Sequence, residues 1–410
     1  MTQPNEPAVD RPPVTADLAP PLTEAQTETT QTRIGRFRVN TDALRAYTMV
    51  FALVVIWVYF HYATDGIFLD ARNFSNLMRQ TAVTGIAAVG MLMVIVTGNI
   101  DLSIGSLLGF VGVLAGALQG EAHGWGLVPT LLVAVGVAVI MGEVQGALVA
   151  YANIPAFIVT LGGLLAWRGV ALGMARGETI PVRAPGFKEI GQQYVSPAIG
   201  YVIAALAVAA VVWLSVRRHR ARRRYGLEGA STLSLAARVA VPSLVIVTFI
   251  WFLNSYAGVP VPVIILIVVA LAGAFLTQNT TFGRYLYAIG GNPEAARLSG
   301  INVRNYVWAV FAIMGALVGV ASVIYTARVG AAAPDAGNLL ELDAIAACVI
   351  GGTSLMGGRG TVFGACLGAL FMASLDNGMQ LLGVHNYTQF ITKGAILVAA
   401  VGLDMLGRKP

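Results

Sequence analysis

The sequence predicts an all-α polytopic membrane protein with about ten to twelve transmembrane helices, some discontinuous, in two pseudo-repeated halves. Of its 410 residues, 57% are hydrophobic and 11% are charged, with a mean hydropathy of +0.74. Soluble domains carry roughly 25% charged residues. The apolar residues form long runs, and a helix of about 20 such residues crosses the hydrocarbon core. Two similar glycine-rich segments interrupt these runs and indicate the two halves.

The N-terminal stretch differs from the rest of the chain. Residues 1–46 are rich in Pro, Thr, Glu and Gln and contain no apolar run, which predicts a disordered cytosolic tail. They also lack the apolar core of a cleaved signal peptide. Residues 47–410 form the predicted transmembrane domain. The expected spans are 47–64, 77–98, 102–119, 127–150, 154–174, 197–216, 239–257, 259–277, 306–325, 342–355, 361–379 and 387–406.

Two of these spans are unusual. The run at 342–355 is short for a full crossing, and the run at 102–119 is broken at Asp101. We therefore expect some of the helices to be discontinuous.

Lys and Arg are divided unequally between alternate loops, which sets the orientation of a membrane protein. With the N-terminus in the cytosol, seventeen of them lie on the cytosolic side and six on the other side. We therefore expect both termini, a basic insertion at 217–238 and a central loop at 278–305 to be cytosolic. The Arg-rich cluster after the span at 197–216 should fix this topology and meet anionic lipid rather than nucleic acid. The seventeen are Arg33, Arg36, Arg38, Arg45, Arg217, Arg218, Arg220, Arg222, Arg223, Arg224, Arg238, Arg284, Arg297, Arg304, Arg359, Arg408 and Lys409; the six are Arg72, Arg79, Arg176, Arg183, Lys188 and Arg328.

The central loop contains signals for a short helix. Asn292 can cap its N-terminus, Pro293 suits the first helical position, and Glu294 favours the positive end of the helix dipole. Gly300 suits the left-handed residue that ends a helix. Because so short a helix is marginal in water, we expect either its own membrane domain or a groove on a soluble partner to hold it. The predicted helix and its ends are Asn292, Pro293, Glu294, Ala295, Ala296, Arg297, Leu298, Ser299 and Gly300.

The two glycine-rich segments, 96–105 and 349–358, match in Val, Gly, Leu and Gly at equal offsets. Each joins an inbound span to an outbound span, so the two halves are expected to be parallel repeats. The alternative is that small residues recur there only to let helices pack closely.

The chain carries no pattern for catalysis or cofactor binding. It has no Gly-x-x-x-x-Gly-Lys-Ser/Thr sequence to cradle a phosphate, and residues 351–360 are glycine-rich but lack the lysine. Its four histidines, His61, His123, His219 and His385, are scattered, so neither a zinc site nor a catalytic triad is expected. Cys348 and Cys366 lie in apolar runs and are expected to be buried thiols.

Several motifs resemble the permease subunits of bacterial ABC monosaccharide importers, the ribose and xylose permease family, and within it D-xylose permeases most. The similarity runs from about residue 45 to the C-terminus. One departure is Glu143-Val-Gln145-Gly146, where the family has a neutral stretch that ends in Asn-Gly. The motifs are Ala71-Arg-Asn-Phe-Ser-Asn-Leu-Met-Arg-Gln80, Asn99-Ile-Asp-Leu-Ser-Ile-Gly105, Ile154-Pro-Ala-Phe-Ile-Val-Thr-Leu-Gly162, the stretch 282–301, the stretch 343–360, Met372-Ala-Ser-Leu-Asp-Asn-Gly-Met379 and the basic insertion after Val216.

The resemblance implies a homodimeric pore in the bacterial inner membrane that carries a monosaccharide, with D-xylose as the expected cargo. It implies a periplasmic sugar-binding protein on one side and a cytosolic ATPase subunit, which holds ATP and Mg²⁺, on the other. The helix at 292–300 then matches the family's coupling helix, and the flanking spans 259–277 and 306–325 should carry its movement to the pore. The chain itself should bind no metal or cofactor and catalyse no reaction.

Charged residues inside spans cost at least about 2.5–3.5 kcal/mol, so they face a bundle interior or a wet cavity. A sugar offers hydroxyl groups to polar side chains and a ring face to aromatic ones. The alternative is that the carboxylates cap broken helices or pair with Arg168 and Lys393. The charged residues are Asp101, Glu143, Arg168, Glu341, Asp343, Asp376 and Lys393, and the candidate sugar-pathway residues are Asn99, Asp101, Ser103, Trp167, Arg168, Asp376, Asn377 and Gln380.

Two other classes of protein fit part of this pattern. A secondary sugar transporter, driven by protons or sodium, would use the same buried carboxylates and work without an ATPase. A structural or receptor-like membrane protein would transport nothing with any partner. The capped helix in the central loop, together with the family motifs in their order along the chain, favours the ATP-driven importer over both.

Overall fold

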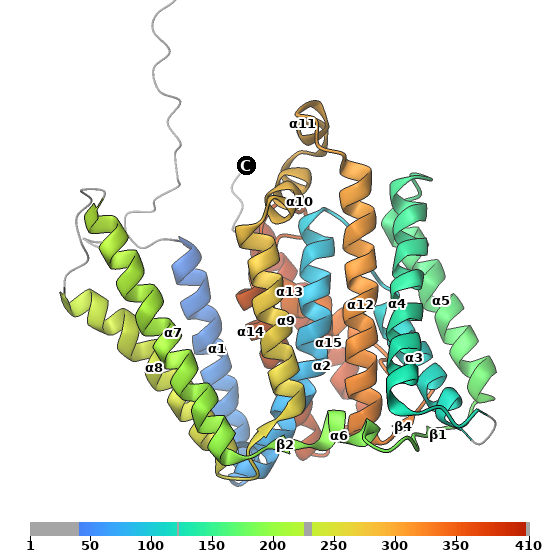
Figure 1. Ribbon diagram of the computed structural model, residues 1–410, viewed down its shortest axis with the longest axis horizontal. Coiled ribbons are helices and arrows are strands. Elements are labelled where there is room, and N and C mark those ends of the chain that lie inside the picture. Colours follow the sequence, from blue (N-terminus) through green and yellow to red (C-terminus); the bar gives the residue numbers. More distant parts are fainter. Residues whose placement is uncertain (1–40, 121–122, 225–231, 407–410) are drawn as a thin grey trace, which may run out of the picture. The chain divides into compact units, whose positions relative to one another are not determined.

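The computed structural model describes residues 41–120, 123–224 and 232–406. The predicted tail lies outside these residues up to position 40, and helix α1 (Thr41–Ala63) begins before the first expected span. The chain divides into Met1–Leu44 and one compact unit, Arg45–Pro410, whose described part is a bundle of roughly parallel and antiparallel helices (Figure 1).

The helices of the bundle follow the expected spans closely. Eight of those in the described residues are long and apolar enough to cross a membrane. Together with α1, α3, α13 and α15, they run back and forth between two ends of the bundle, which we call the α11 face and the α6 face after the short helices there (Figure 1). The elements are α1, η1 (Ile67–Leu69), α2 (Ala71–Val96), α3 (Ile104–Gln119), α4 (Leu127–Ala150), α5 (Ala156–Ala175), β1 (Ile180–Pro181), α6 (Phe187–Gln192), β2 (Tyr194–Val195), α7 (Pro197–Arg224), α8 (Thr232–Asn254), β3 (Val259–Pro260), α9 (Val261–Asn279), α10 (Thr281–Gly291), α11 (Pro293–Leu298), α12 (Val303–Val329), β4 (Ala331–Ala332), α13 (Leu340–Ile350), α14 (Val362–Leu381) and α15 (Asn386–Leu406).

Two short strand pairs lie at the α6 face. β1 pairs with β4, and β2 pairs with β3, both antiparallel. The first pair ties the segment after α5 to the segment after α12. The second ties the start of α7 to the start of α9. The ends of helices far apart in the sequence are therefore held together at this face.

Helices α3 and α13 are the predicted discontinuous ones. α2 ends at Val96, and the chain stays non-helical until α3 begins at Ile104. Before α13, the chain is irregular from Gly330 to Leu339 apart from β4. The two breaks meet, since a side chain on Gly105 would collide with the Gly337 carbonyl oxygen.

The two halves are related by inversion rather than as parallel repeats, so the predicted parallel relation is wrong. The helix contacts of one half are repeated in the other. Helix α2 packs on α14, and its counterpart α12 packs on α4. Helix α3 packs on α5, its counterpart α13 packs on α15, and α2 and α12 pack on each other. Helix α2 runs from the α6 face to the α11 face, whereas its counterpart α12 runs the other way (Figure 1). The segments α1–α5 and α9–α15 therefore correspond with opposite directions, with the hairpin α7–α8 between them. The glycine-rich segment at 96–105 precedes a short helix, whereas that at 349–358 follows one, so the two are not equivalent.

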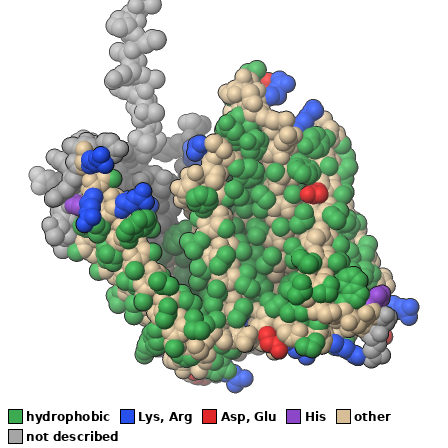
Figure 2. Space-filling view, in the orientation of Figure 1, with side chains coloured by type: hydrophobic (Ala, Val, Ile, Leu, Met, Phe, Trp, Pro, Cys, Tyr) green, Lys and Arg blue, Asp and Glu red, His purple; other side chains and the backbone are tan. Residues whose placement is uncertain are grey.

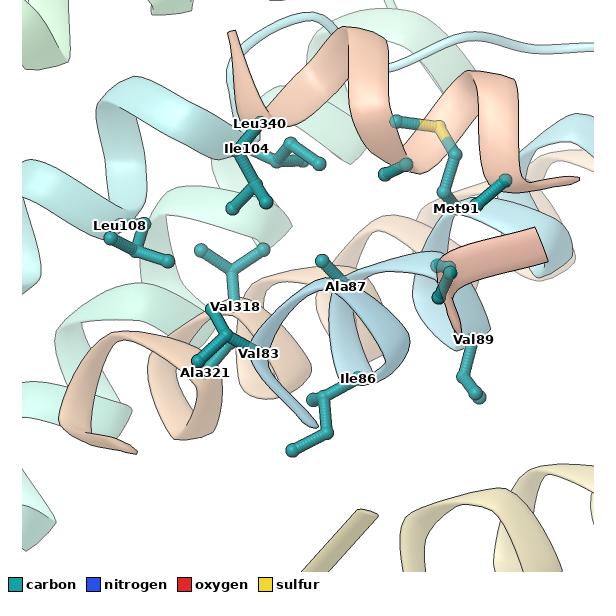
Figure 3. Packing of buried hydrophobic residues seen from close by; sticks show 14 of the residues in the cluster. Val83, Ile86, Ala87, Val89, Met91, Ile104, Leu108, Val318, Ala321 and Leu340 are labelled. Atoms are coloured by element: carbon teal, nitrogen blue, oxygen red, sulfur yellow. The ribbon is translucent and has the colours of Figure 1, made fainter. Parts of the chain in front are cut away.

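The centre of the bundle is a layer of apolar side chains around α2. Figure 3 shows Val83 of α2 beside Val318 of α12, on the same side as Leu108 of α3. These side chains are fully or almost fully buried. Cys348 on α13 is a buried free thiol, as expected, and Cys366 on α14 is a partly buried one.

The outside of the bundle is apolar between the two faces (Figure 2). Large exposed hydrophobic side chains include Leu132 of α4, Leu165 of α5, Leu244 of α8 and Leu271 of α9. Such a surface is suited to lipid and not to water. Helix α7 continues to Arg224, so its Arg-rich cluster lies on the last turns of a helix, and residues 225–231 of the basic insertion lie outside the described part.

Candidate functional site

The predicted helix of the central loop is present as α11. Its N-cap Asn292 accepts a hydrogen bond from Ala295 N at 3.0 Å, and Gly300 has a φ of 83°. Glu294 and Arg297 form an exposed ion pair at 2.7 Å. The hydrogen bond from Arg297 lowers the pKa of the Glu294 carboxyl, so the pair is charged at neutral pH. Leu298 is 78% exposed, which leaves an apolar side chain at the tip of the molecule.

A second helix in the loop, α10, was missed from the sequence. Thr280 caps it by accepting from Gly283 N at 3.2 Å, and Leu286 and Ile289 are buried against the bundle. The spacing of Phe282, Leu286 and Ile289 after a capping threonine is the signal that could have revealed it. Helix α10 lies between the end of α9 and α11, and α11 projects beyond the bundle (Figure 1).

Helix α10 contacts the glycine-rich turn between α13 and α14. The Tyr287 hydroxyl donates to the Gly360 carbonyl oxygen at 2.8 Å. Gly290 lies so close to the end of α2 and to the turn that a side chain on it would meet Val96 O and Gly358 N. Gly358 N itself donates to Val96 O at 2.9 Å. We call these contacts the glycine junction.

The first group of candidate pathway residues gathers around the start of α3. Asp101 accepts hydrogen bonds from Ser103 N at 2.8 Å and from Ser103 Oγ at 2.7 Å, within the loop that leads into α3. Ser103 Oγ also lies 3.1 Å from Gln145 Oε1 of α4. The Asn99 amide bonds to Thr97 Oγ1 at 3.0 Å. The alternative interpretation of Asp101 as a helix cap is wrong, because its bonds end at Ser103, the N-cap residue, and no described side chain caps α3.

Helix α5 brings Trp167 and Arg168 to the same region. Arg168 Nη1 donates to Pro334 O at 2.6 Å and to Ala336 O at 3.0 Å, in the irregular stretch before α13. The hydrogen bonds of Arg168 Nη1 therefore go to backbone carbonyl oxygens and not to a carboxylate. Trp167 stacks on Phe110 of α3, with ring centroids 6.2 Å apart.

Two buried donors in this group lack an acceptor among the described residues, Gln145 Nε2 and Trp167 Nε1. Both lie next to Gly163 of α5, at the place where a side chain on that glycine would be. Gln145 is only 2% exposed. Buried donors usually have partners, so this pair could bind an oxygen-rich ligand. Sequence reasoning noted Gln145 only as part of a departure from the family pattern.

The second group of candidates lies on α14 and bonds to other helices. Asp376 pairs with Lys393 of α15 at 2.9 Å, and Lys393 also pairs with Asp343 of α13 at 3.0 Å. Asn377 and Asn73 of α2 exchange hydrogen bonds of 2.8 and 3.1 Å.

Gln380 lines a cavity of about 530 Å³ at the α6 face. This group bonds to α2, α13 and α15, whereas the first bonds to α4 and the irregular stretch before α13. The carboxylates Asp343 and Asp376 pair with Lys393, as the alternative interpretation expected.

Comparisons with known proteins agree with this architecture. Residues 73–223 and 223–401 match the family described as branched-chain amino acid transport system / permease component. The xylose transport system permease protein of Escherichia coli is 47% identical over 361 residues, which cover 88% of this chain and 92% of the relative. The same-named protein of Haemophilus influenzae is 44% identical over 91% of this chain and 99% of its own.

A ribose import permease protein of Escherichia coli is 35% identical over 92% of this chain and 98% of the relative. No solved structure matches the chain.

Proposed function

The chain belongs to the family of branched-chain amino acid transport system permease components, and from this premise we propose that it is the membrane-spanning subunit of an ATP-driven importer of D-xylose. The observation that carries the proposal is the 47% identity to a xylose transport system permease protein over nearly the whole chain. The lower identity to a ribose import permease favours xylose over ribose. The apolar helix bundle supports a multi-pass protein of the inner membrane.

We propose that a cytosolic ATPase subunit docks on α11 and that ATP and Mg²⁺ bind to that subunit. The exposed Glu294–Arg297 pair and the exposed Leu298 support a docking role, since they form a charged rim beside an apolar anchor. The α11 face would then be cytosolic, with both termini on that side. The excess of Lys and Arg in the loops expected on the cytosolic side supports this orientation.

We propose that two copies of the chain pair through α5 and α15, with the pathway between them and a periplasmic sugar-binding protein on the α6 face. Gly162, Gly169 and Gly173 on α5 and Gly394 on α15 each have open space, with no described atom within 4 Å of the point that a Cβ would take. Open glycines on membrane helices allow another helix to approach closely. The two helices also correspond under the inversion that relates the halves.

The pairing is tested by disulfide cross-linking in membranes. Gly169→Cys should give a covalent dimer under mild oxidation, because the two copies of α5 would face each other. Val245→Cys, on the exposed face of α8, is the control and should stay monomeric. Dimers from Val245→Cys alone would contradict the proposed interface.

We propose that the sugar meets the group around the start of α3 on its way through. The unpartnered donors Gln145 Nε2 and Trp167 Nε1 support this, because a sugar hydroxyl can accept from both. Trp167→Phe keeps a ring at the site and removes one donor, so xylose uptake should fall up to about tenfold at limiting xylose. Trp213→Phe, on the exposed face of α7, should leave uptake unchanged.

The function is tested by reconstitution in vesicles with the ATPase and the sugar-binding protein. Uptake of labelled xylose should require ATP, persist with an uncoupler and exceed uptake of ribose. Accumulation of sugar by the permease alone, or its collapse with an uncoupler while ATP is present, would instead identify a secondary transporter. Uptake of ribose in place of xylose would overturn only the assignment of the cargo.

A further inference from the structure

The glycine junction joins three stretches that are far apart in the sequence: α10, the end of α2 and the turn between α13 and α14. Its contacts are between backbones. Gly358 N donates to Val96 O at 2.9 Å, and a side chain on Gly357 would lie within about 3 Å of Gly290 O and Val96 O. Gly357 and Gly358 have φ values of 87° and 71°, which glycine adopts without strain. Close backbone contacts leave little room for one stretch to move without the others.

Each stretch of the junction leads to a different part of the bundle. The end of α2 continues into the irregular segment before α3, in which Asp101 accepts a hydrogen bond from Ser103 N at 2.8 Å. The turn leads into α14 through Thr361, which accepts from Gly364 N at 3.1 Å. Helix α10 is joined to α11 by Asn292 alone, and this residue is both the C-cap of α10 and the N-cap of α11.

A side-chain hydrogen bond strengthens the junction. The hydroxyl of Tyr287 on α10 donates to Gly360 O at 2.8 Å, at the far end of the turn from α13. On the other side of α10, Tyr285 is partly exposed and lies edge-on to the ring of Tyr306 on α12. Tyr287 therefore ties α10 to the turn, whereas Tyr285 lies against a neighbouring helix.

From these contacts we infer that α10 transmits the movement of α11 to the break between α2 and α3 and to the start of α14, with Tyr287 and Gly290 as the positioning residues. A pull on α11 moves α10 directly through Asn292. The glycine junction then shifts the end of α2 and the start of α14 together. This route exists beside the flanking helices α9 and α12, and it rests on the proposed function, in which an ATPase pulls on α11.

The test compares two variants with two matched controls in vesicles that contain the permease, its ATPase and its sugar-binding protein. Tyr287→Phe removes only the hydroxyl that bonds to Gly360, and Tyr285→Phe removes a hydroxyl on the other side of α10. Gly290→Ala places a methyl group in the junction, whereas Gly291→Ala places one where no described atom lies within 4 Å. The readouts are co-purification of the ATPase, the rate of ATP hydrolysis and the xylose taken up per ATP.

We expect Tyr287→Phe and Gly290→Ala to retain the ATPase and to hydrolyse ATP, while xylose taken up per ATP falls about fivefold. For Tyr287→Phe, a fivefold fall corresponds to the loss of one hydrogen bond of typical strength. Tyr285→Phe and Gly291→Ala should keep the wild-type ratio. A merely structural role for the junction would lower the amount of assembled complex and leave the ratio unchanged.

The outcomes separate this inference from the proposed function. If the wild-type assembly takes up no sugar with ATP, the proposed function fails and the inference fails with it. If the wild type transports and Tyr287→Phe keeps the wild-type ratio, the inference alone is wrong. Should Gly290→Ala not assemble, Tyr287→Phe decides the matter, because it keeps the ring and the backbone intact.

Discussion

At the scale of single residues, Lys393 forms two largely buried ion pairs whose charges have to compensate one another. One ammonium group lies 3.0 Å from Asp343 and 2.9 Å from Asp376, among otherwise apolar helices. These two pairs join α15 to both α13 and α14. Removing one member of a buried pair leaves an uncompensated charge, which costs more than the pair contributes.

We predict that Lys393→Met destabilises the protein by about 3–5 kcal/mol, because both carboxylates lose their counter-ion. Thermal unfolding in detergent measures the effect. Lys188→Met, on α6 at the end of the bundle, is the matched control and should unfold like the wild type.

The triple variant Lys393→Met, Asp343→Asn, Asp376→Asn should recover much of the stability, since no uncompensated charge then remains at this site. If Lys393→Met unfolds at the wild-type temperature, these ion pairs do not hold α15.

At the scale of the element, α4 and α12 are held together by close approach of their backbones. A side chain on Gly142 would collide with Phe311 O and lie about 3 Å from Gly315, and a side chain on Gly319 would meet Ala138. Small residues at such a crossing allow dispersion contacts along the whole helix pair, which is how helices associate in a membrane.

We predict that Gly142→Leu separates α4 from α12 and costs at least about 3 kcal/mol, the upper end of the range for overpacking, since backbone atoms cannot move aside. At Gly136, on the same helix, an added Cβ has no described atom within 4 Å, so Gly136→Leu should be tolerated. The amount of folded protein extracted from membranes compares the two. Equal yields of both variants would contradict this account of the crossing.

At the scale of the whole molecule, α11 is a short exposed helix that projects beyond the helix bundle (Figure 1). Ala296 is buried and the Glu294–Arg297 pair faces outward, so the outer surface of α11 can change without loss of the fold. The exchange Glu294→Arg, Arg297→Glu keeps an ion pair within the helix and reverses its direction.

We predict that this exchange releases the ATPase while the permease stays folded, because the charges that meet the partner are inverted. Co-purification with the ATPase measures binding, and size-exclusion chromatography of the permease checks the fold. Exchange of Glu178 for Lys, an exposed site beyond α5 on the α6 face, is the control and should leave the ATPase bound. Wild-type co-purification of the exchanged protein would show that α11 is not the docking helix.

Much of the fold and part of the site could be predicted from local sequence signals. The spans were visible because each needs a long apolar run to cross lipid, and α11 was visible because Asn292, Pro293 and Gly300 act on their own neighbours. Helix α10 was missed, because residues 278–305 were interpreted as a polar loop and the apolar residues spaced along one face of α10 were overlooked. The partners of Lys393 remained an open alternative, because Asp343 and Asp376 lie on helices elsewhere in the chain.

The sequence by itself determined the class of the protein, the approximate positions of the membrane helices, and the two interruptions at α3 and α13. These features follow from hydrophobicity and local hydrogen bonding, which neighbouring residues decide. Only the tertiary structure decided that the halves are inverted, that Gln145 and Trp167 leave donors unpartnered beside Gly163, and that α10 touches both α2 and the turn before α14. These relations join residues far apart in the chain, and they exist only once backbones pack against each other.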